Sequence, residues 1–260
     1  MAALISAVEP VGTLDLTPSL LALAVALLSG LLSGLSGFGA GLMLSAFLVP
    51  ILGAKPTIAV LAVAMVITNL GRIFAFREWP RWRPAVFVVI GSIPAMVPCA
   101  WLLARISDAL AGLVVAVALL ASLALRRLAK RSQLHIGPGG LTLGGAVVGS
   151  ISGLSTGGGV MIIPLLLGAG LAGAALIATD AAISLTLHIA RAIAFERFSL
   201  LDSDLVVLGI VLGIATIPGS WLAAGLIRRT KLEVHALALE LLVLIVALWI
   251  GASSLQLILA

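Results

Sequence analysis

Two glycine-rich stretches decide how this chain folds: residues 30–41 read GLLSGLSGFGAG, and residues 149–159 read GSISGLSTGGG. Each stretch interrupts a long apolar segment, at about 16–52 and 140–170. Glycine permits sharp backbone turns and close approach of other groups, so we expect each segment to break there. The piece after each break is shorter than the roughly 20 residues that span a bilayer. Each stretch therefore predicts a broken or re-entrant membrane segment, and full crossing and turning back are both open.

The composition places the chain in a membrane. Of its 260 residues, 62% are hydrophobic and 10% are charged, and the mean hydropathy is +1.30. Soluble domains are about half apolar and a quarter charged, so the bilayer must be the solvent of this chain. Its length allows about eight to ten membrane segments. The basic residues lie in short runs between apolar segments, which is typical of loops that set topology and speaks against a nucleic-acid surface.

The chain is an internal duplication. Further helix-length apolar segments follow at 56–76, 84–104 and 109–125, and again at 171–195, 204–227 and 232–259. Three landmarks recur in the same order 119 or 120 residues later: Ser33-Gly34-Leu35-Ser36 at 152–155, Asn69-x-x-Arg72 as His188-x-x-Arg191, and Pro98-x-x-Trp101 as Pro218-x-x-Trp221. We therefore predict an all-α polytopic protein with a first repeat at 1–125, a basic cytoplasmic linker at 126–139 and a second repeat at 140–260.

The positions of the basic residues indicate how the repeats are oriented. If each glycine-split segment turns back or crosses twice, each half makes an odd number of net crossings and the halves are inverted. An outside N-terminus then puts the richest basic clusters, at 77–83, 126–131 and 228–231, in the cytoplasm, where Lys- and Arg-rich loops belong. A single plain crossing would put two of these clusters on opposite faces. The sequence therefore predicts inverted repeats, each with a glycine-broken segment and three transmembrane helices.

The glycine stretches are also the predicted substrate site. Non-helical backbone at membrane depth persists only when it is buried in protein or lines a wet cavity. A helix that starts after such a turn directs free N–H groups toward that cavity, and nearby hydroxyls add donors, which suits an anion. The residues predicted to bind substrate here are Ser33, Gly34, Ser36, Gly37, Gly39, Ser152, Gly153, Ser155, Thr156, Gly157, Gly158 and Gly159. Alternatively, glycines spaced four apart, such as Gly30 and Gly34, only let helices pack closely.

A polar stripe lies on one face of a predicted helix in the second half. It consists of Asp180, Ser184, His188 and Arg191, and the matching positions of the first half hold Leu61, Met65, Asn69 and Arg72. Their spacing of three or four residues puts each set on one helix face. A guanidinium fork matches the oxygens of a carboxylate, phosphate or sulfonate. We therefore predict that Asn69, Arg72, His188 and Arg191 bind an anionic substrate. The alternative for both arginines is snorkelling toward the membrane surface.

Three ionisable residues are candidates for proton coupling: Asp180, His188 and Glu240. An isolated carboxylate in mid-membrane is costly, so we expect Asp180 to be protonated, paired with Arg191 or His188, or part of a proton path. His188 titrates in a useful range, but it is equally well explained as a hydrogen-bonding residue. Glu240 has the alternative of pairing with the basic cluster at 228–231. The single Cys99 offers neither a disulfide nor a metal cluster, and we expect no metal and no cofactor.

These features resemble the sulfite exporter TauE/SafE family, also called the TSUP or DUF81 transporters. The resemblance rests on the duplicated glycine stretches, on Pro50 and Pro164 after them, and on the helices with Asn69/Arg72 and His188/Arg191. It covers about residues 20–255. It implies a bacterial-type inner-membrane transporter of sulfite, sulfoacetate, other organosulfonates or related carboxylates. The implied partners are the bilayer, a small anionic substrate and H⁺ as a candidate coupling ion; a homo-oligomer is compatible, and no nucleic acid is expected.

Two other classes of function fit parts of the sequence. An intramembrane serine hydrolase would use Ser36 or Ser155, each in a Gly-x-Ser setting, with His188 as base. That motif is short and duplicated, whereas a single active site needs it once. A membrane scaffold without transport would leave the polar stripe without a role. We therefore predict a transporter and not an enzyme, working by alternating access.

Overall fold

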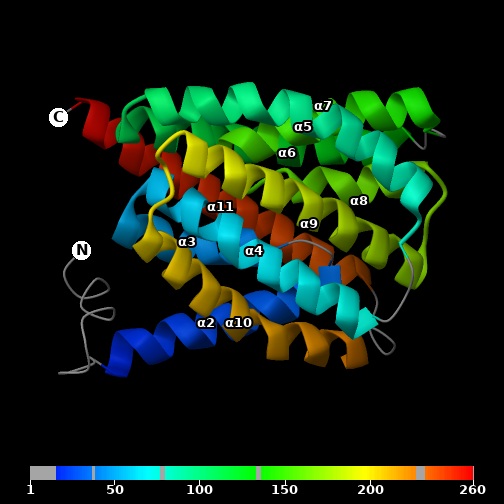
Figure 1. Ribbon diagram of the computed structural model, residues 1–260, viewed down its shortest axis with the longest axis horizontal. Helices are drawn as coiled ribbons and strands as arrows, with labels where there is room; N and C mark the ends of the chain where they lie inside the picture. The colour runs from blue at the N-terminus through cyan, green and yellow to red at the C-terminus, as the bar shows by residue number, and fades with distance from the viewer. Residues whose placement is uncertain (1–15, 37–38, 77–79, 133–135, 227–231, 260) are drawn as a thin grey trace.

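The fold is built from helices. In the computed structural model the described residues are 16–36, 39–76, 80–132, 136–226 and 232–259, and every regular element within them is a helix (Figure 1). The first half contains α2 (Leu16–Ser36), α3 (Ala40–Leu52), α4 (Ala54–Phe76), α5 (Trp82–Arg105) and α6 (Asp108–Ser132). The second half contains α7 (Pro138–Leu154), α8 (Gly159–Gly168), α9 (Gly173–Arg197), α10 (Ser203–Leu226) and α11 (Leu232–Leu259). The predicted all-α class is confirmed.

Five of the described helices, α4, α5, α6, α9 and α10, are long and apolar enough to cross a bilayer. The protein is therefore a multi-pass membrane protein. Helices α3 and α8 are apolar but have only 13 and 10 residues, so at about 1.5 Å per residue they reach at most two thirds of the roughly 30 Å hydrocarbon core. Pro50 and Pro164 lie inside these short helices and do not end them.

The chain breaks where the glycines predict. Gly39, the N-cap of α3, has a φ of 118°, which glycine adopts without the clash that a Cβ would cause. In the second half, α7 ends at Leu154 and α8 starts at Gly159. The N–H of Ile136, just before α7, donates to the carbonyl of Gly168, the last residue of α8, over 2.8 Å. Because their outer ends lie together, α7 and α8 form a hairpin that turns back inside the protein.

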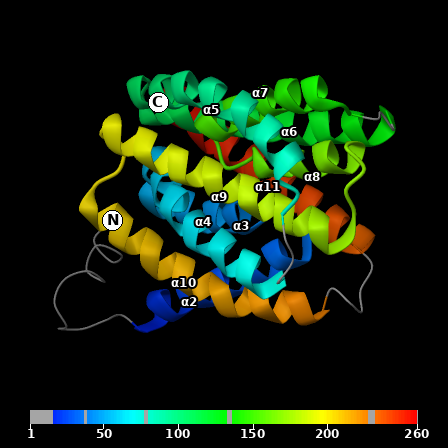
Figure 2. The same ribbon diagram turned by 45° about the vertical axis from the view of Figure 1, so that its right-hand side comes forward.

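Equivalent helices of the two halves make equivalent contacts. Helix α2 packs on α10 as α7 packs on α5, α4 packs on α10 as α9 packs on α5, and α4 lies against α9 (Figures 1 and 2). Glycines make the first two contacts close: a Cβ on Gly30 would lie 2.0 Å from the Thr216 carbonyl oxygen, and one on Gly149 would lie 2.0 Å from that of Ser92. The helix-packing interpretation therefore holds for Gly30 and Gly149.

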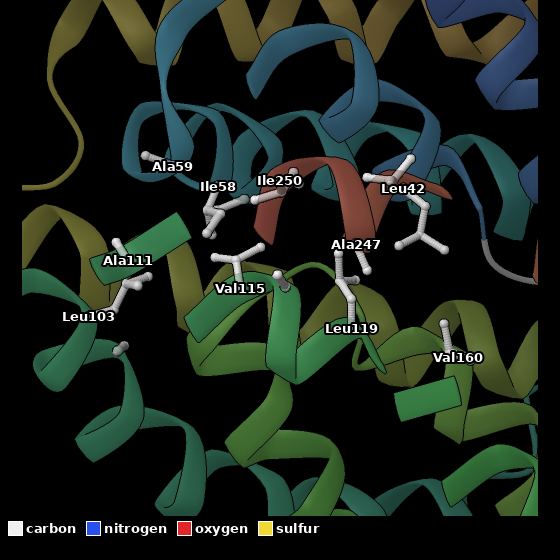
Figure 3. Close-up of a cluster of buried hydrophobic side chains, with 14 of the residues drawn as sticks. Leu42, Ile58, Ala59, Leu103, Ala111, Val115, Leu119, Val160, Ala247 and Ile250 are labelled. Carbon is white, nitrogen blue, oxygen red and sulfur yellow. The ribbon is translucent and has the colours of Figure 1, made fainter. Parts of the chain in front are cut away.

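Both short helices are anchored in one apolar core. Figure 3 shows Leu42 of α3 and Val160 of α8 in the same cluster as side chains of α4, α5, α6 and α11. Leu42, Val160 and Leu119 are each at most 1% exposed. Because this cluster draws on both halves, burial of apolar surface fixes where the two breaks meet.

Contacts between helix termini define the two ends of the bundle. At one end, Lys55 at the start of α4 donates to the carbonyl of Ile106, which follows α5, and lies 3.6 Å from Asp108 at the start of α6. At the other end, the first turns of α5, α7 and α9 line one cavity. We call this second end the basic end, because α6 carries its basic residues toward it and continues through them to Ser132.

Candidate anion site between the broken helices

Arg72 of α4 is held by a buried carboxylate of the other half. Its Nη2 lies 2.6 Å from Oδ2 of Asp180 on α9, and its Nη1 donates to Oδ1 of Asn69 over 2.9 Å. Arg72 and Asp180 are 1% and 0% exposed. Snorkelling of Arg72 is therefore excluded. The expected pairing of Asp180 with Arg191 or His188 is wrong, because the crossing of α4 and α9 brings it to Arg72 instead.

Arg191 of α9 is also buried, but its partners are neutral. Its Nη1 donates to the carbonyl oxygens of Ser152 and Ser155 over 3.0 and 2.9 Å, and its Nη2 lies 3.1 Å from Nδ1 of His188. The guanidinium also stacks at 5.8 Å from the ring centre of Phe195. Among the described residues no carboxylate lies within 4 Å of it. Arg191 therefore caps the end of α7 and keeps a positive charge without an acidic partner.

The two arginines are equivalent by sequence and different in environment. Asn69 bonds Arg72 as His188 contacts Arg191, which is the relation that the 119-residue repeat predicts. The repeat also relates Asp180 to Leu61, which is fully buried. The second half thus supplies a carboxylate to Arg72, but the first half supplies none to Arg191. Within the described residues, one arginine is therefore neutralised by a carboxylate and the other is not.

The two chain breaks meet beside Arg191. Oγ of Ser45, in α3, lies 3.0 Å from Oγ1 of Thr156, in the α7–α8 break. A Cβ on Gly41 would lie 3.5 Å from Cβ of Thr156 and 3.7 Å from Sδ of Met65. Thr156 directly follows Ser155, whose carbonyl binds Arg191. The start of α3 has no side-chain cap, so its first N–H groups add to the donors at this junction.

Other predicted site residues lie at varying distances from the junction. Gly157 and Gly158 are buried in the break, where the Gly157 N–H donates to Oγ of Ser155 over 3.1 Å. Gly34 and Gly153 face away: a Cβ on Gly34 would meet Ala223 of α10, and one on Gly153 would meet Met96 of α5. We therefore assign Gly34 and Gly153 to helix packing and leave them out of the site proposed below.

The remaining predictions divide between placed and undescribed residues. Gly39 and Gly159 start the two short helices, and Ser33, Ser152 and Ser184 are buried. Gly37 and the side chains of Ser36 and Glu240 lie outside the described part of the chain. Asp180 and Arg191 are 11 residues apart, about 16 Å along α9, so the stripe serves two separate places. Ser45 was not predicted, since a lone serine in an apolar helix usually bonds its own backbone; Ser45 does so, to the Gly41 carbonyl, and contacts Thr156 in addition.

Three buried polar atoms lack a hydrogen-bond partner within the described residues: Nε of Arg72, Oδ1 of Asp180 and Nε of Arg191. A buried polar atom without a partner costs about 1–3 kcal/mol. Arg72 and Asp180 at least compensate each other's charge. For Arg191 the unused Nε donor and the unpaired charge coincide on one group. This combination marks Arg191 as the place where an additional acceptor, such as an anion, gains most.

The hydrolase alternative lacks its geometry at Ser155. The Ser155 hydroxyl donates to the Ile151 carbonyl over 3.2 Å and accepts from the Gly157 N–H. Nδ1 of His188, the supposed base, faces Arg191. A serine nucleophile needs a hydrogen bond to its base, and Ser155 makes none to His188.

Fold and site together define the class of protein. Two broken helices that meet beside buried ionisable residues, within a bundle of membrane-spanning helices, are typical of secondary transporters. The family model described as "Sulfite exporter TauE/SafE" matches residues 22–251. The chain therefore belongs to this family, whose members are membrane transporters and not enzymes. No curated protein and no solved structure matches the chain.

Proposed function

We propose that this protein is a secondary transporter of small sulfur-containing anions, such as sulfite, sulfoacetate or other organosulfonates, and that the anion binds at Arg191. The observation that carries the proposal is the contrast between the two arginines. Arg72 has the carboxylate of Asp180 at 2.6 Å, whereas Arg191 is 1% exposed and has only neutral partners in the part of the chain that the structure describes. A buried guanidinium without an acid is expensive unless an anion arrives to compensate it.

The groups around the junction suit an oxyanion. The Ser45 hydroxyl donates to the Gly41 carbonyl over 2.6 Å and therefore accepts from Thr156. The donors for an anion are the free N–H groups at the start of α3 and, once it turns from Ser45, the hydroxyl of Thr156. A sulfite or sulfonate group presents three oxygens, so it uses several donors at once, as phosphate does at a helix N-terminus. Binding requires that Arg191 turn part of its fork from the Ser152 and Ser155 carbonyls toward the ligand. Arg72 has no comparable freedom, because Asp180 already occupies it.

The arrangement of the helices supports alternating access through inverted repeats. The α7–α8 hairpin opens toward the basic end, where the Ile136–Gly168 hydrogen bond ties it. The α2–α3 pair points the other way in Figure 1, and α3 leads directly into α4 at the opposite end. Two hairpins that enter from opposite faces favour rocking of one half against the other around a central site. In this proposal the basic end faces the cytoplasm of a bacterial-type inner membrane and the N-terminus lies outside.

Proton coupling is the finer part of the proposal. Asp180 joins the two halves through Arg72, and protonating its carboxylate would break that ion pair. A proton on Asp180 would therefore loosen one contact between the halves and favour their relative movement. His188, beside Arg191, and Glu240 remain the other candidates. A homo-oligomer is compatible with this mechanism and is not required by it.

Uptake into proteoliposomes tests the proposal. The assay measures radiolabelled sulfite and sulfoacetate for the wild type and for Arg191→Ala, with Arg197→Ala as control, because Arg197 is exposed in the last turn of the same helix. Losing a charge-assisted contact costs about 1.5–3 kcal/mol, which is roughly a 10- to 100-fold loss of affinity. We expect that loss for Arg191→Ala and wild-type transport for Arg197→Ala. Normal transport by Arg191→Ala would disprove the assignment.

A further inference from the structure

The basic end contains a cavity that the proposed transport site does not use. It has a volume of about 580 Å³ and is open to the surroundings. Its wall is formed by the first turn of α5, the first turn of α7 and the turn between α8 and α9. Arg81 and Arg83 contribute its cationic groups, and Phe87, Leu141 and Leu171 contribute apolar surface. The cavity thus combines positive charge and apolar wall in one opening.

The charged groups around the cavity are all positive. None of the residues that line it is acidic, and among the described residues neither Arg81 nor Arg83 makes an ion pair. The helices that start around it, α5, α7 and α9, all begin without a side-chain cap. Free N–H groups and the positive ends of three helix dipoles therefore add to the two guanidinium groups. All of these contributions favour an anion.

The backbone around the cavity is held in place by specific contacts. The N–H of Arg81 donates to Oγ1 of Thr179 over 2.9 Å, which fixes the start of α5 to α9. The Ile136–Gly168 hydrogen bond fixes the start of α7 to the end of α8. Gly170 and Gly173 have φ values of 83° and 60°, which let the α8–α9 turn fold back against α7. The cavity is therefore part of the folded scaffold.

The depth of the cavity along the membrane normal points to the lipid headgroup region. It lies where three apolar helices begin, and the first residue of α5, Trp82, is 60% exposed. An exposed Trp at a helix end, next to arginines, is typical of the membrane–water interface. Basic cavities between transmembrane helices on the cytoplasmic side suit anionic lipid headgroups. A free inorganic anion would use the arginines but not the apolar wall.

We propose that this cavity binds an anionic phospholipid, with its phosphodiester between Arg81 and Arg83 and the upper part of an acyl chain along Phe87 and Leu171. The bound lipid bridges α5, α7 and the α8–α9 turn. It therefore stabilises the α7–α8 hairpin against the rest of the bundle. This site is distinct from the junction at Arg191, so the proposal stands whatever the transported anion is.

Thermal unfolding in nanodiscs tests the lipid site. Wild type, the double variant Arg81→Ala/Arg83→Ala and the control Arg197→Ala are compared in phosphatidylcholine alone and with added phosphatidylglycerol. Arg197 is an exposed arginine at the opposite end of the bundle, so it controls for general attraction to negative lipid. If bound phosphatidylglycerol stabilises the folded state by about 1 kcal/mol, the Tm of a chain this long rises by roughly 2–4 °C. We expect this gain for the wild type and for Arg197→Ala, and its loss in the double variant.

Two further arms keep the test decisive. In phosphatidylcholine alone the double variant should melt like the wild type, which shows that it folds. If it does not fold, Ala175→Glu replaces it: Ala175 lines the cavity in the first turn of α9, where an acid suits the helix dipole but repels a phosphate. An equal phosphatidylglycerol gain in these variants would overturn the proposal. So would an arginine-dependent gain from inorganic phosphate added to phosphatidylcholine discs, which would make the site one for small anions.

Discussion

Nη2 of Arg72 lies 2.6 Å from Oδ2 of Asp180, and this buried ion pair joins the two halves of the protein. The pair links α4 to α9, two of the helices long and apolar enough to span the bilayer. Its counterpart across the repeat does not exist, because Leu61 stands where a second aspartate would complete the symmetry. The two halves therefore make equivalent helix contacts but carry an asymmetric charge distribution.

Breaking the Arg72–Asp180 pair from one side should be costly. Removing one partner of a buried ion pair leaves an uncompensated charge and costs about 3–5 kcal/mol, whereas replacing both by apolar residues is often neutral. We expect Asp180→Leu and Arg72→Met each to lower the free energy of unfolding by that amount, and the double variant to recover most of the loss. Thermal unfolding in detergent measures this. A double variant as unstable as the sum of the singles would show that the pair is not a unit.

Asp180 should also govern any pH dependence of transport. Asp180→Asn keeps the shape of the side chain but can neither gain nor lose a proton. If protonation of Asp180 releases Arg72, the pH profile of sulfoacetate uptake, whose charge does not change over the measured range, should flatten in this variant, while His188→Gln and Glu240→Gln keep the wild-type profile. Uptake into proteoliposomes between pH 5 and 8 would measure all three. A flat profile in His188→Gln or Glu240→Gln, with that of Asp180→Asn unchanged, would move the coupling site.

The hydroxyl pair at the junction should contribute to substrate affinity. We expect Thr156→Val to raise the KM for the transported anion by roughly 5- to 10-fold, since a hydrogen bond contributes about 1 kcal/mol or somewhat more when the acceptor is charged. Ser45→Ala should raise it less, because the Ser45 hydroxyl donates to the Gly41 carbonyl and acts only by positioning Thr156. The matched control is the pair Thr68–Thr216, whose hydroxyls lie 2.7 Å apart between α4 and α10. Thr68→Val should leave the KM unchanged. An equal effect at both pairs would indicate a general packing defect.

The glycines at the close helix contacts, such as Gly149, give a stability test that is independent of transport. A Cβ on Gly149 would lie 2.0 Å from the Ser92 carbonyl oxygen, so Gly149→Ala must push α7 from α5 and should cost about 1–3 kcal/mol or more. Gly139, in the first turn of the same helix, has no atom within 4 Å of such a Cβ. Gly139→Ala should therefore be neutral or slightly stabilising. Melting temperatures of the two variants would decide between these expectations.

Sequence reasoning succeeded where a local pattern carries the information. The breaks before α3 and α8 both fall on the glycine stretches. At the first, Gly39 adopts the left-handed conformation that glycine permits; at the second, the chain is extended at Ser155 and uses no left-handed residue. The partner of Asp180 could not be predicted from the sequence, because Arg72 is 108 residues away and only the crossing of two packed helices brings them together. Ser45 was missed for the same reason: its sequence context is that of an ordinary apolar helix, and its significance comes from Thr156 across the junction.

The missing symmetry partner of Arg191 suggests a final test by design. Leu61→Asp places a carboxylate where the repeat puts the equivalent of Asp180, and we expect it to pair with Arg191 as Asp180 pairs with Arg72. The internal acid would then compete with the transported anion, so uptake should fall while the protein stays folded. Leu61→Asn is the matched control, because it adds a polar group of the same size without charge.

Combining the Leu61 variants with Arg191→Ala separates pairing from simple damage. With Arg191 present, Leu61→Asp should melt at a higher temperature than Leu61→Asn, because a buried carboxylate gains from a nearby guanidinium. In the Arg191→Ala background the order should reverse, since the same carboxylate then lacks a partner and costs more than the amide. The same order in both backgrounds would mean that Leu61 and Arg191 are not symmetry mates. A reversed order, together with inhibited uptake, would identify Arg191 as the charge that the transported anion normally neutralises.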